Sequence, residues 1–288
     1  MQNGARSARQ LARNAAKKLE SAGVPEAATS AEVLLAELLG VKRSELTLLE
    51  EPLTDEEVAL YEAWISRRLE REPVQRILGY AYFRNLRIEL DEYTLIPRPD
   101  TESVVDAALE AVDRRSGSCR VLDLGTGSGT IAISIAQERP SCEVHATEDS
   151  DGALRLARRN AARAGAIVRF YETDLISGLD ALEGSIEVLV SNLPYVKSAD
   201  IPKLAPEVRD WDPGAALNGG PDGLDLYRRV FAEVAPLLAN GADTVLEVGD
   251  GQAEEVLELG RRAGFEPLGA HPDLAGTLRA VLLRWDPD

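Results

Sequence analysis

The run VLDLGTGSGTIA, from Val121 to Ala132, decides the fold because three glycines directly follow a short apolar stretch. A short apolar run bounded by glycine is typical of a buried strand, and we expect a helix where apolar residues resume at Ile131. Gly125 and Gly127 allow a sharp turn and let a ligand approach where a β-carbon would clash. The helix that follows presents free N–H groups to a negative or electron-rich partner. The run therefore predicts a ligand site at a strand-to-helix turn.

The glycine spacing separates two classes of cofactor. The pattern is GxGxG, and Thr130 stands where a GxGxxG motif would have its last glycine. Dinucleotide sites use that glycine for close helix–strand packing, so the spacing weakens the nicotinamide interpretation. The run also resembles the first motif of Rossmann-like methyltransferases, in which an acid before the glycines serves the cofactor's amino-acid moiety. A tight turn without a ligand is the competing interpretation. The expected cofactor residues in this run are Asp123, Gly125, Thr126, Gly127, Ser128 and Gly129.

Acidic residues follow the next two predicted strands. Glu148 ends the second strand, and a carboxylate there can accept hydrogen bonds from both hydroxyls of a ribose. Asp149 is the alternative for this contact, and an acid here would also favour the N-terminus of the next helix. After the third strand, Asp174 can hold an adenine amino group while the backbone of Leu175 meets the ring edge. The order of these groups at successive strand ends favours a cofactor site.

The most specific chemistry lies in Asn192-Leu193-Pro194-Tyr195, which follows the fourth predicted strand. An amide or aromatic-amine nitrogen has a delocalised lone pair and is a poor nucleophile. The Asn192 side-chain carbonyl and the Leu193 backbone carbonyl can accept the two NH₂ protons and aim the lone pair at a methyl donor. Pro194 fixes the turn, and Tyr195 can lie flat against the target plane. An ordinary Asn-x-Pro-Tyr turn is the competing interpretation.

The chain divides into three predicted parts. Residues 1–77 read as a helical domain, with capping boxes that start helices at Thr29 and Thr54, the second ending at Glu72 before a proline. Residues 78–95 alternate apolar and polar side chains and predict a β-hairpin linker.

Residues 96–288 alternate β-rich and helical runs, which predicts an α/β domain with a mostly parallel sheet covered on both faces. The last two strands have no helix between them and should form an antiparallel edge. The predicted strands are Arg120–Leu124, Glu143–Thr147, Ile167–Tyr171, Ile186–Ser191, Asp243–Val248, Phe265–Ala270 and Leu278–Trp285.

Composition limits the function. The 288 residues carry a net charge of −17, which argues against broad contact with RNA or DNA. Two cysteines and two histidines, none suitably spaced, predict neither disulfides nor a metal site, and a reducing cytoplasm is the expected location. No apolar run is long enough to span a membrane, and the first residues do not resemble a secretory signal.

Across nearly its whole length the chain resembles the peptide chain release factor glutamine methyltransferases, the PrmC/HemK family. The glycine run and the Asn-x-Pro-Tyr run occur in the family's order. The other matching segments begin at Glu72-Pro73, Ile96-Pro97-Arg98-Pro99-Asp100-Thr101-Glu102, Asp212-Pro213, Leu246-Glu247-Val248-Gly249 and Asp273-Leu274-Ala275-Gly276.

The resemblance implies a Rossmann-like class I methyltransferase domain, with a seven-stranded sheet, preceded by a small helical domain that grips the substrate. S-adenosylmethionine would be the methyl donor and S-adenosylhomocysteine the product. The partner would be a class I release factor, methylated on the glutamine of its GGQ motif. The resemblance assigns Asn192, Leu193, Pro194 and Tyr195 to that glutamine, and places Arg98 and Thr101 near the mouth of the site.

The sequence departs from the family pattern in four places. Leu193 replaces the usual proline, but that position contributes a backbone carbonyl, so we expect activity to survive. Glu148 replaces an aspartate and offers a longer arm for the same contact. Arg76 and Trp211 also differ, in positions that concern substrate docking.

Two alternatives stay open at this point. An adenine-N6 methyltransferase acting on RNA or DNA would use the same amine geometry, and the Asn-Leu-Pro-Tyr form of this chain also occurs among ribosomal RNA adenine methyltransferases. A non-enzymatic cofactor binder would leave Asn192 and Tyr195 idle.

Overall fold

The structure is a computed structural model that describes residues 7–49, 51–115 and 117–286. The chain separates into two units. Unit 1 holds the residues up to Gly79 together with Pro206–Trp211, and unit 2 holds Tyr80–Ala205 and the residues from Asp212 onward. The insertion of 206–211 into unit 1 was not anticipated from the sequence.

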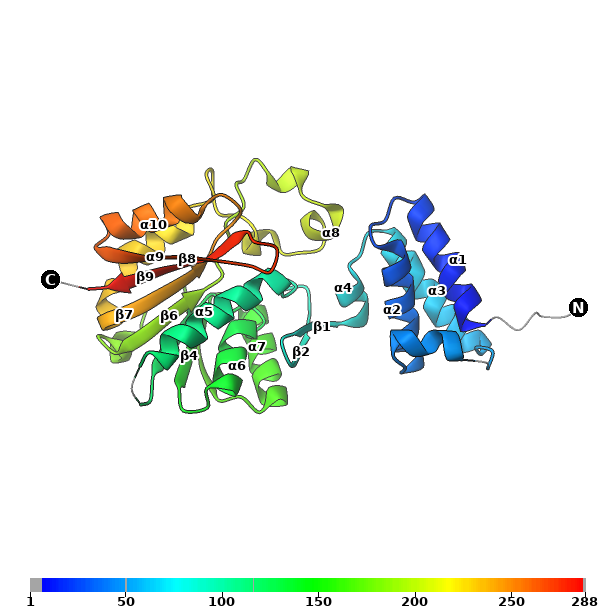
Figure 1. Cartoon of the computed structure of the whole chain (residues 1–288), viewed down its shortest axis with the longest axis horizontal. Helices are drawn as coiled ribbons and strands as arrows, with labels where there is room; N and C mark the ends of the chain where they lie inside the picture. Colours follow the sequence, from blue (N-terminus) through cyan, green and yellow to red (C-terminus); the bar gives the residue numbers. More distant parts are fainter. Residues whose placement is uncertain (1–6, 50, 116, 287–288) are drawn as a thin grey trace, which may run out of the picture. The chain divides into compact units, whose positions relative to one another are not determined.

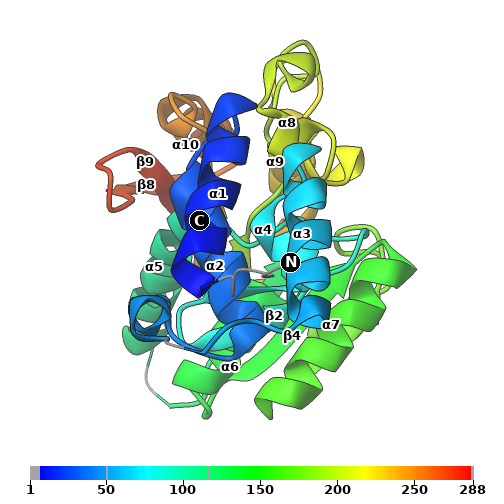
Figure 2. The ribbon, with the colours of Figure 1, turned by 90° about the vertical axis from the view of Figure 1, so that its right-hand side faces the viewer.

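Unit 1 is helical, and its helices bury their apolar faces against one another. Helices α1, α2 and α3 lie side by side (Figures 1 and 2), and their shared core includes Leu19, Leu34, Leu35 and Tyr61. The Tyr61 hydroxyl donates to the Ala31 carbonyl at 2.9 Å, so this buried polar group is satisfied. The helices of unit 1 are α1 (Ala8–Ser21), α2 (Ala27–Leu39), α3 (Asp55–Leu69), α4 (Val74–Leu78) and α8 (Pro206–Arg209).

Two predicted helix boundaries need correction, and one is confirmed. The capping box at Thr54 opens α3 as expected. Helix α2 begins at Ala27 rather than after Thr29, and the Glu32 carboxylate pairs with Arg43 instead of capping the helix. Helix α3 ends at Leu69, three residues before the predicted Glu72.

Glu207 binds two arginines of unit 1. Its carboxylate accepts from Arg71 at 2.7 Å and from the buried Arg68 at 3.0 Å. Burial alone would raise the pKa of Glu207, but these hydrogen bonds lower it to about 2. The ion pairs therefore tie the segment Pro206–Trp211 to α3 and the turn that follows it.

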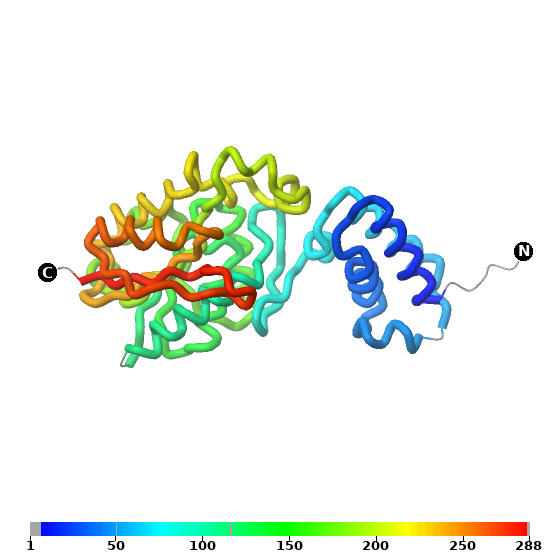
Figure 3. Tube along the Cα trace, turned by 45° about the horizontal axis from the view of Figure 1, so that its top comes forward, coloured from blue at the N-terminus to red at the C-terminus, as the bar shows by residue number. Residues whose placement is uncertain are grey.

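Unit 2 is built on the predicted seven-stranded sheet. The strand order is β5-β4-β3-β6-β7-β9-β8; the pairs from β5 to β7 are parallel, and β9 runs antiparallel to both of its neighbours, β7 and β8. The C-terminal pair β8 and β9 runs side by side at one edge (Figure 3). Six of the seven predicted strands match the structure to within two residues at each end, and the seventh, β7, begins five residues earlier than predicted. The strands are β3 (Arg120–Leu124), β4 (Glu143–Glu148), β5 (Val168–Glu172), β6 (Ile186–Ser191), β7 (Leu238–Glu247), β8 (Phe265–Pro272) and β9 (Leu278–Trp285).

Helices cover both faces of this sheet (Figure 1). The central strands are therefore buried on both sides, which explains their continuous apolar sequence. One core lies under α5 and α6, and the other under α9 and α10. No helix among the described residues is long and apolar enough to cross a membrane. The helices are α5 (Glu102–Asp113), α6 (Thr130–Glu138), α7 (Asp151–Ala164), α9 (Asp225–Glu233) and α10 (Ala253–Arg262).

The predicted hairpin forms, but it is shorter than expected. Strands β1 (Tyr80–Phe83) and β2 (Leu86–Glu89) pair antiparallel. Phe83 and Ile88 are buried in the core under α5, so the hairpin belongs to unit 2. The predicted continuation to residue 95 is not a strand, and residues 92–95 instead line a cavity described below.

Candidate functional site

The glycine run forms the turn between β3 and α6. Gly125, Gly127 and Gly129 all have positive φ, at 66°, 56° and 84°, a conformation that strongly favours glycine. Gly129 also has a packing role, because an added β-carbon would lie 2.8 Å from Ile133 Cδ1 and 3.3 Å from the Ala157 backbone. The third glycine thus lets α6 approach α7.

Asp123 lies beneath this turn. Its side chain is fully buried, and Oδ2 accepts from the Thr126 hydroxyl at 2.6 Å and from the Ala132 N–H at 3.2 Å. Burial raises the pKa of Asp123 to about 7. Its Oδ1 is buried and has no hydrogen-bond partner among the described residues. This carboxylate shapes the glycine turn and keeps one acceptor oxygen unused.

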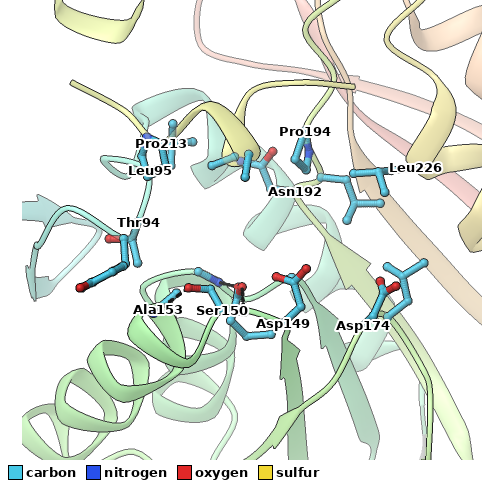
Figure 4. A pocket seen from close by; sticks show the side chains of 18 of the residues that line it. Thr94, Leu95, Asp149, Ser150, Ala153, Asp174, Asn192, Pro194, Pro213 and Leu226 are labelled. Carbon is cyan, nitrogen blue, oxygen red and sulfur yellow. Dashed lines mark hydrogen bonds between the residues drawn. The ribbon is translucent and has the colours of Figure 1, made fainter. Parts of the chain in front are cut away.

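A cavity of about 330 Å³ opens above the C-terminal ends of the parallel strands. Such a volume lies within the range of small-molecule sites. In Figure 4, Asn192 and Pro194 lie on one side of this cavity and Asp149, Ser150 and Asp174 on the other. The predicted site residues that line it are Gly125, Gly127, Glu148, Asp149, Asp174, Leu175, Asn192, Leu193 and Pro194.

Other predicted site residues lie outside this lining. Asp123, Thr126 and Ser128 are buried in the glycine turn, and Gly129 faces α7. Three further residues, Arg98, Thr101 and Tyr195, contact the loops that form the cavity rather than the cavity itself.

The two acids at the end of β4 differ in their surroundings. Glu148 is nearly buried, and its carboxylate accepts from the Gly127 N–H at 2.8 Å and the Ser150 N–H at 3.1 Å. Burial raises the pKa of Glu148, while these backbone hydrogen bonds oppose the rise. Asp149 is exposed and also faces the cavity. Both remain candidates for a ribose contact.

Asp174 and Leu175 follow β5 and lie at the far end of the lining. Both Asp174 oxygens accept from Arg229, at 3.0 and 3.1 Å, so an amino group would have to share this carboxylate. Leu175 has a φ of 50°, unusual for a branched residue, which turns its backbone at the cavity wall.

The loop after β6 contacts the glycine turn directly. A β-carbon on Gly125 would lie 3.5 Å from Leu193 Cδ2, so the two loops pack side by side. The Asn192 amide donates from Nδ2 to the Thr101 hydroxyl at 3.3 Å. That bond occupies the donor end of the amide, while Oδ1 has no hydrogen-bond partner among the described residues, on a residue that lines the cavity.

Gly219, Gly223 and Gln252 pack against the backbone of Pro194 and Tyr195. A β-carbon on Gly219 would lie 2.7 Å from the Pro194 oxygen, and one on Gly223 would lie 2.3 Å from the Tyr195 oxygen. Gln252 Nε2 donates to the Tyr195 carbonyl at 3.1 Å. These contacts fix the backbone path of the loop that carries Asn192.

Arg98 and Thr101 come from the segment between the hairpin and α5. Arg98 donates to the buried Asp212 carboxylate at 2.5 Å, which in turn accepts from the Ile96 N–H at 3.4 Å. Thr101 is buried, with its hydroxyl against Asn192. Both residues support the neighbouring loops in this structure.

The sequence did not reveal several residues of the site. Residues 92–95 line the cavity, and the Tyr93 ring lies against Gly152, where an added β-carbon would come within 2.4 Å of it. Their alternating pattern resembled a strand, and the glycine at position 152 was the only signal of a close contact. Pro213, Ala215, Ala216 and Leu226 complete the lining.

Comparisons with known proteins agree on the type of protein. The model of the PrmC N-terminal domain matches residues 10–79, and that of the methyltransferase small domain matches residues 104–207. A release factor glutamine methyltransferase of Geobacter sulfurreducens is 42% identical, over 86% of this chain and 86% of its own. That of Streptomyces coelicolor is 41% identical over 94% and 95%. A solved methyltransferase structure from Pyrococcus furiosus has a TM-score of 0.53 at 20% identity, covering 78% of this chain and 98% of that one, and it supports the fold.

Proposed function

Because the chain belongs to the release factor glutamine methyltransferase family, we propose that it methylates the side-chain amide nitrogen of a release-factor glutamine. The methyl donor is S-adenosylmethionine, and the target is the glutamine of a GGQ motif. The observation that carries this proposal is the cavity that brings Asn192 beside the glycine turn and Glu148. We expect the reaction to take place in the cytoplasm, where release factors act.

The residues around the cavity suit S-adenosylmethionine. Its volume and its acidic lining fit a nucleoside that carries a positive charge. The unused Oδ1 of Asp123, beneath the turn, is an acceptor suited to the amino group of the cofactor's methionine part. Glu148 or Asp149 would hold the ribose, and the Leu175 backbone and Asp174 the adenine. When bound, the cofactor supplies an electrophilic methyl group on a positively charged sulfur.

Asn192 and Leu193 act on the target amide. The Asn192 Oδ1 and the Leu193 carbonyl accept the two NH₂ protons, which fixes the plane of the glutamine amide and turns its nitrogen toward the methyl donor. Tyr195 and Pro194 support this arrangement from their side of the loop. Positioning of this kind can supply a large part of the roughly 7–11 kcal/mol available from proximity. The methylated nitrogen becomes acidic and loses its proton afterwards, so no base is needed before transfer.

A nucleic-acid substrate is less favoured. The relatives that match most of the chain are named for release factors, and the net charge of −17 opposes phosphate binding. The helical unit 1 remains our proposed docking domain for the protein substrate.

Mass spectrometry tests the proposal. A release factor incubated with the protein and S-adenosylmethionine should gain one methyl group, about 14 Da, on the glutamine of its GGQ motif. A release factor with that glutamine replaced by alanine is the control. Methylation of the control, or of RNA in place of the release factor, would overturn the proposal.

A further inference from the structure

We propose that Glu247, buried behind the cavity, is a positioning residue that fixes the orientation of the Asn192 amide through the Thr101 hydroxyl. The inference rests on the proposed function, because it concerns how Asn192 presents its oxygen to the target. Glu247 would act without touching substrate or cofactor.

The topology brings these residues together. Strands β6 and β7 are parallel neighbours, with Ser191 paired to Leu246. Asn192 and Glu247 therefore follow paired residues at the same end of the sheet. Glu247 is 1% exposed and does not line the cavity.

Glu247 is linked to both functional side chains of the loop. The Tyr195 hydroxyl donates to Glu247 Oε1 at 3.3 Å. The Thr101 hydroxyl lowers the pKa of the Glu247 carboxyl, as a neighbouring donor does, and it accepts from Asn192 Nδ2 at 3.3 Å. Oε2 is buried and has no partner of ordinary hydrogen-bond geometry among the described residues, so it can take the Thr101 proton.

The direction of the hydrogen bonds follows from the charge on Glu247. An ionised carboxylate only accepts hydrogen bonds, so the Thr101 hydroxyl must direct its proton toward Glu247. The oxygen of Thr101 then has only lone pairs to offer Asn192, and it selects the NH₂ end of the amide. The carbonyl end, Oδ1, is left to accept a proton from the target. If one hydrogen bond in the series Glu247–Thr101–Asn192 were reversed, Asn192 would present its NH₂ group to the target in place of Oδ1.

The surroundings of Glu247 make this arrangement sensitive to pH. Burial raises the pKa of Glu247 to about 7, and the Thr101 and Tyr195 hydroxyls and the charge of Arg279 oppose the rise. The nearby Asp100 raises it further. Arg279 itself is paired with Asp273 at 3.1 Å and with Asp100 at 3.4 Å, so its charge is shared. Once protonated, Glu247 can donate, and the direction imposed on Thr101 is lost.

The first test removes the hydroxyl of Thr101 while keeping its shape. In the full-length protein, Thr101→Val should lower kcat for release-factor methylation by about 10- to 100-fold. Thr101→Ser, which restores the hydroxyl, should recover kcat to within about threefold of the wild type. The dissociation constant for S-adenosylhomocysteine, measured by calorimetry, and the melting temperature should stay close to wild-type values in both variants.

The second test uses pH. With both substrates saturating, kcat of the wild type should rise with pH through about 7, because ionised Glu247 is the competent form. Glu247→Gln has a side-chain amide that does not titrate, so its kcat should be low and should not rise in that range. Equal kcat in Thr101→Val and wild type, or a rise near pH 7 that survives in Glu247→Gln, would overturn the inference. Failure of the wild type itself to methylate a release factor would instead overturn the proposed function.

Discussion

The carboxyl group of Asp123, beneath the glycine turn, makes the stability of the folded protein depend on pH. Its pKa is raised by burial from 3.8 to about 7, so the folded protein holds a proton there that the unfolded chain releases above pH 4. The stability associated with this group is therefore complete below about pH 4 and is lost as pH rises through 7.

We predict that Asp123→Asn removes this dependence. Between pH 5 and 8 the free energy of unfolding of the wild type should fall by about 2 kcal/mol relative to Asp123→Asn, as urea titrations can measure. Asp113→Asn is a surface control. The pKa of Asp113 is lowered by its hydrogen bond to Arg139, so any effect should have the opposite sign and a more acidic range. Parallel pH curves for wild type and Asp123→Asn would contradict this assignment.

At the scale of single residues, the sequence predicted those that line the cavity better than those that support them. Glu148 and Asn192 were predictable because they end strands next to recognisable turns. Glu247 and Gln252 were not assigned roles, because their contacts reach residues more than 50 positions away in the chain. Only the tertiary structure shows that Gln252 holds the backbone of Tyr195.

At the scale of elements, a substitution at Gly129 can separate the cost of a packing clash from the cost of backbone strain. Gly129→Ala places a β-carbon against Ile133 and Ala157 at a φ of 84°, whereas at Gly178, with a φ of 74°, an added β-carbon meets nothing within 4 Å. Gly129→Ala should therefore lower the free energy of unfolding by about 1–3 kcal/mol more than Gly178→Ala does. Equal losses in chemical denaturation would mean that α6 and α7 do not pack tightly at Gly129.

Strands were easier to predict than helix ends. Buried parallel strands have continuous apolar sequences bounded by polar turns, which explains why Arg120–Leu124 and Ile186–Ser191 were predicted without error. The predicted start of α2 was wrong because Glu32, the acid of the expected capping box, pairs with Arg43 instead. The predicted strand at residues 92–95 was wrong because an alternating apolar and polar pattern also occurs in a segment that lines a cavity.

At the scale of the whole molecule, unit 1 should serve the protein substrate only. Deletion of residues 1–79, combined with Glu207→Gln to avoid an unpaired charge, should abolish methylation of an intact release factor. Affinity for S-adenosylhomocysteine, measured by calorimetry, should remain within about threefold, because the residues that line the cavity all belong to unit 2. Normal methylation by this truncated protein would rule out a docking role.

The sequence predicted three parts, whereas the structure divides the chain into two units and includes the hairpin in unit 2. The change from helical to alternating patterns near residue 80 marks the end of the first part of unit 1. The return of Pro206–Trp211 to that unit depends on the pairing of Glu207 with Arg68 and Arg71, more than 130 positions away. Local patterns carry no information about such a contact.

The most direct measurement is steady-state methylation of a release factor by Asn192→Ala, together with its affinity for S-adenosylhomocysteine. Asn85→Ala, in the exposed turn between β1 and β2 of unit 2 and outside the cavity lining, is the matched control. If the Asn192 oxygen holds the target amide, kcat should fall by about 10²–10³, while the affinity changes less than about threefold. Wild-type turnover by Asn192→Ala would contradict the account.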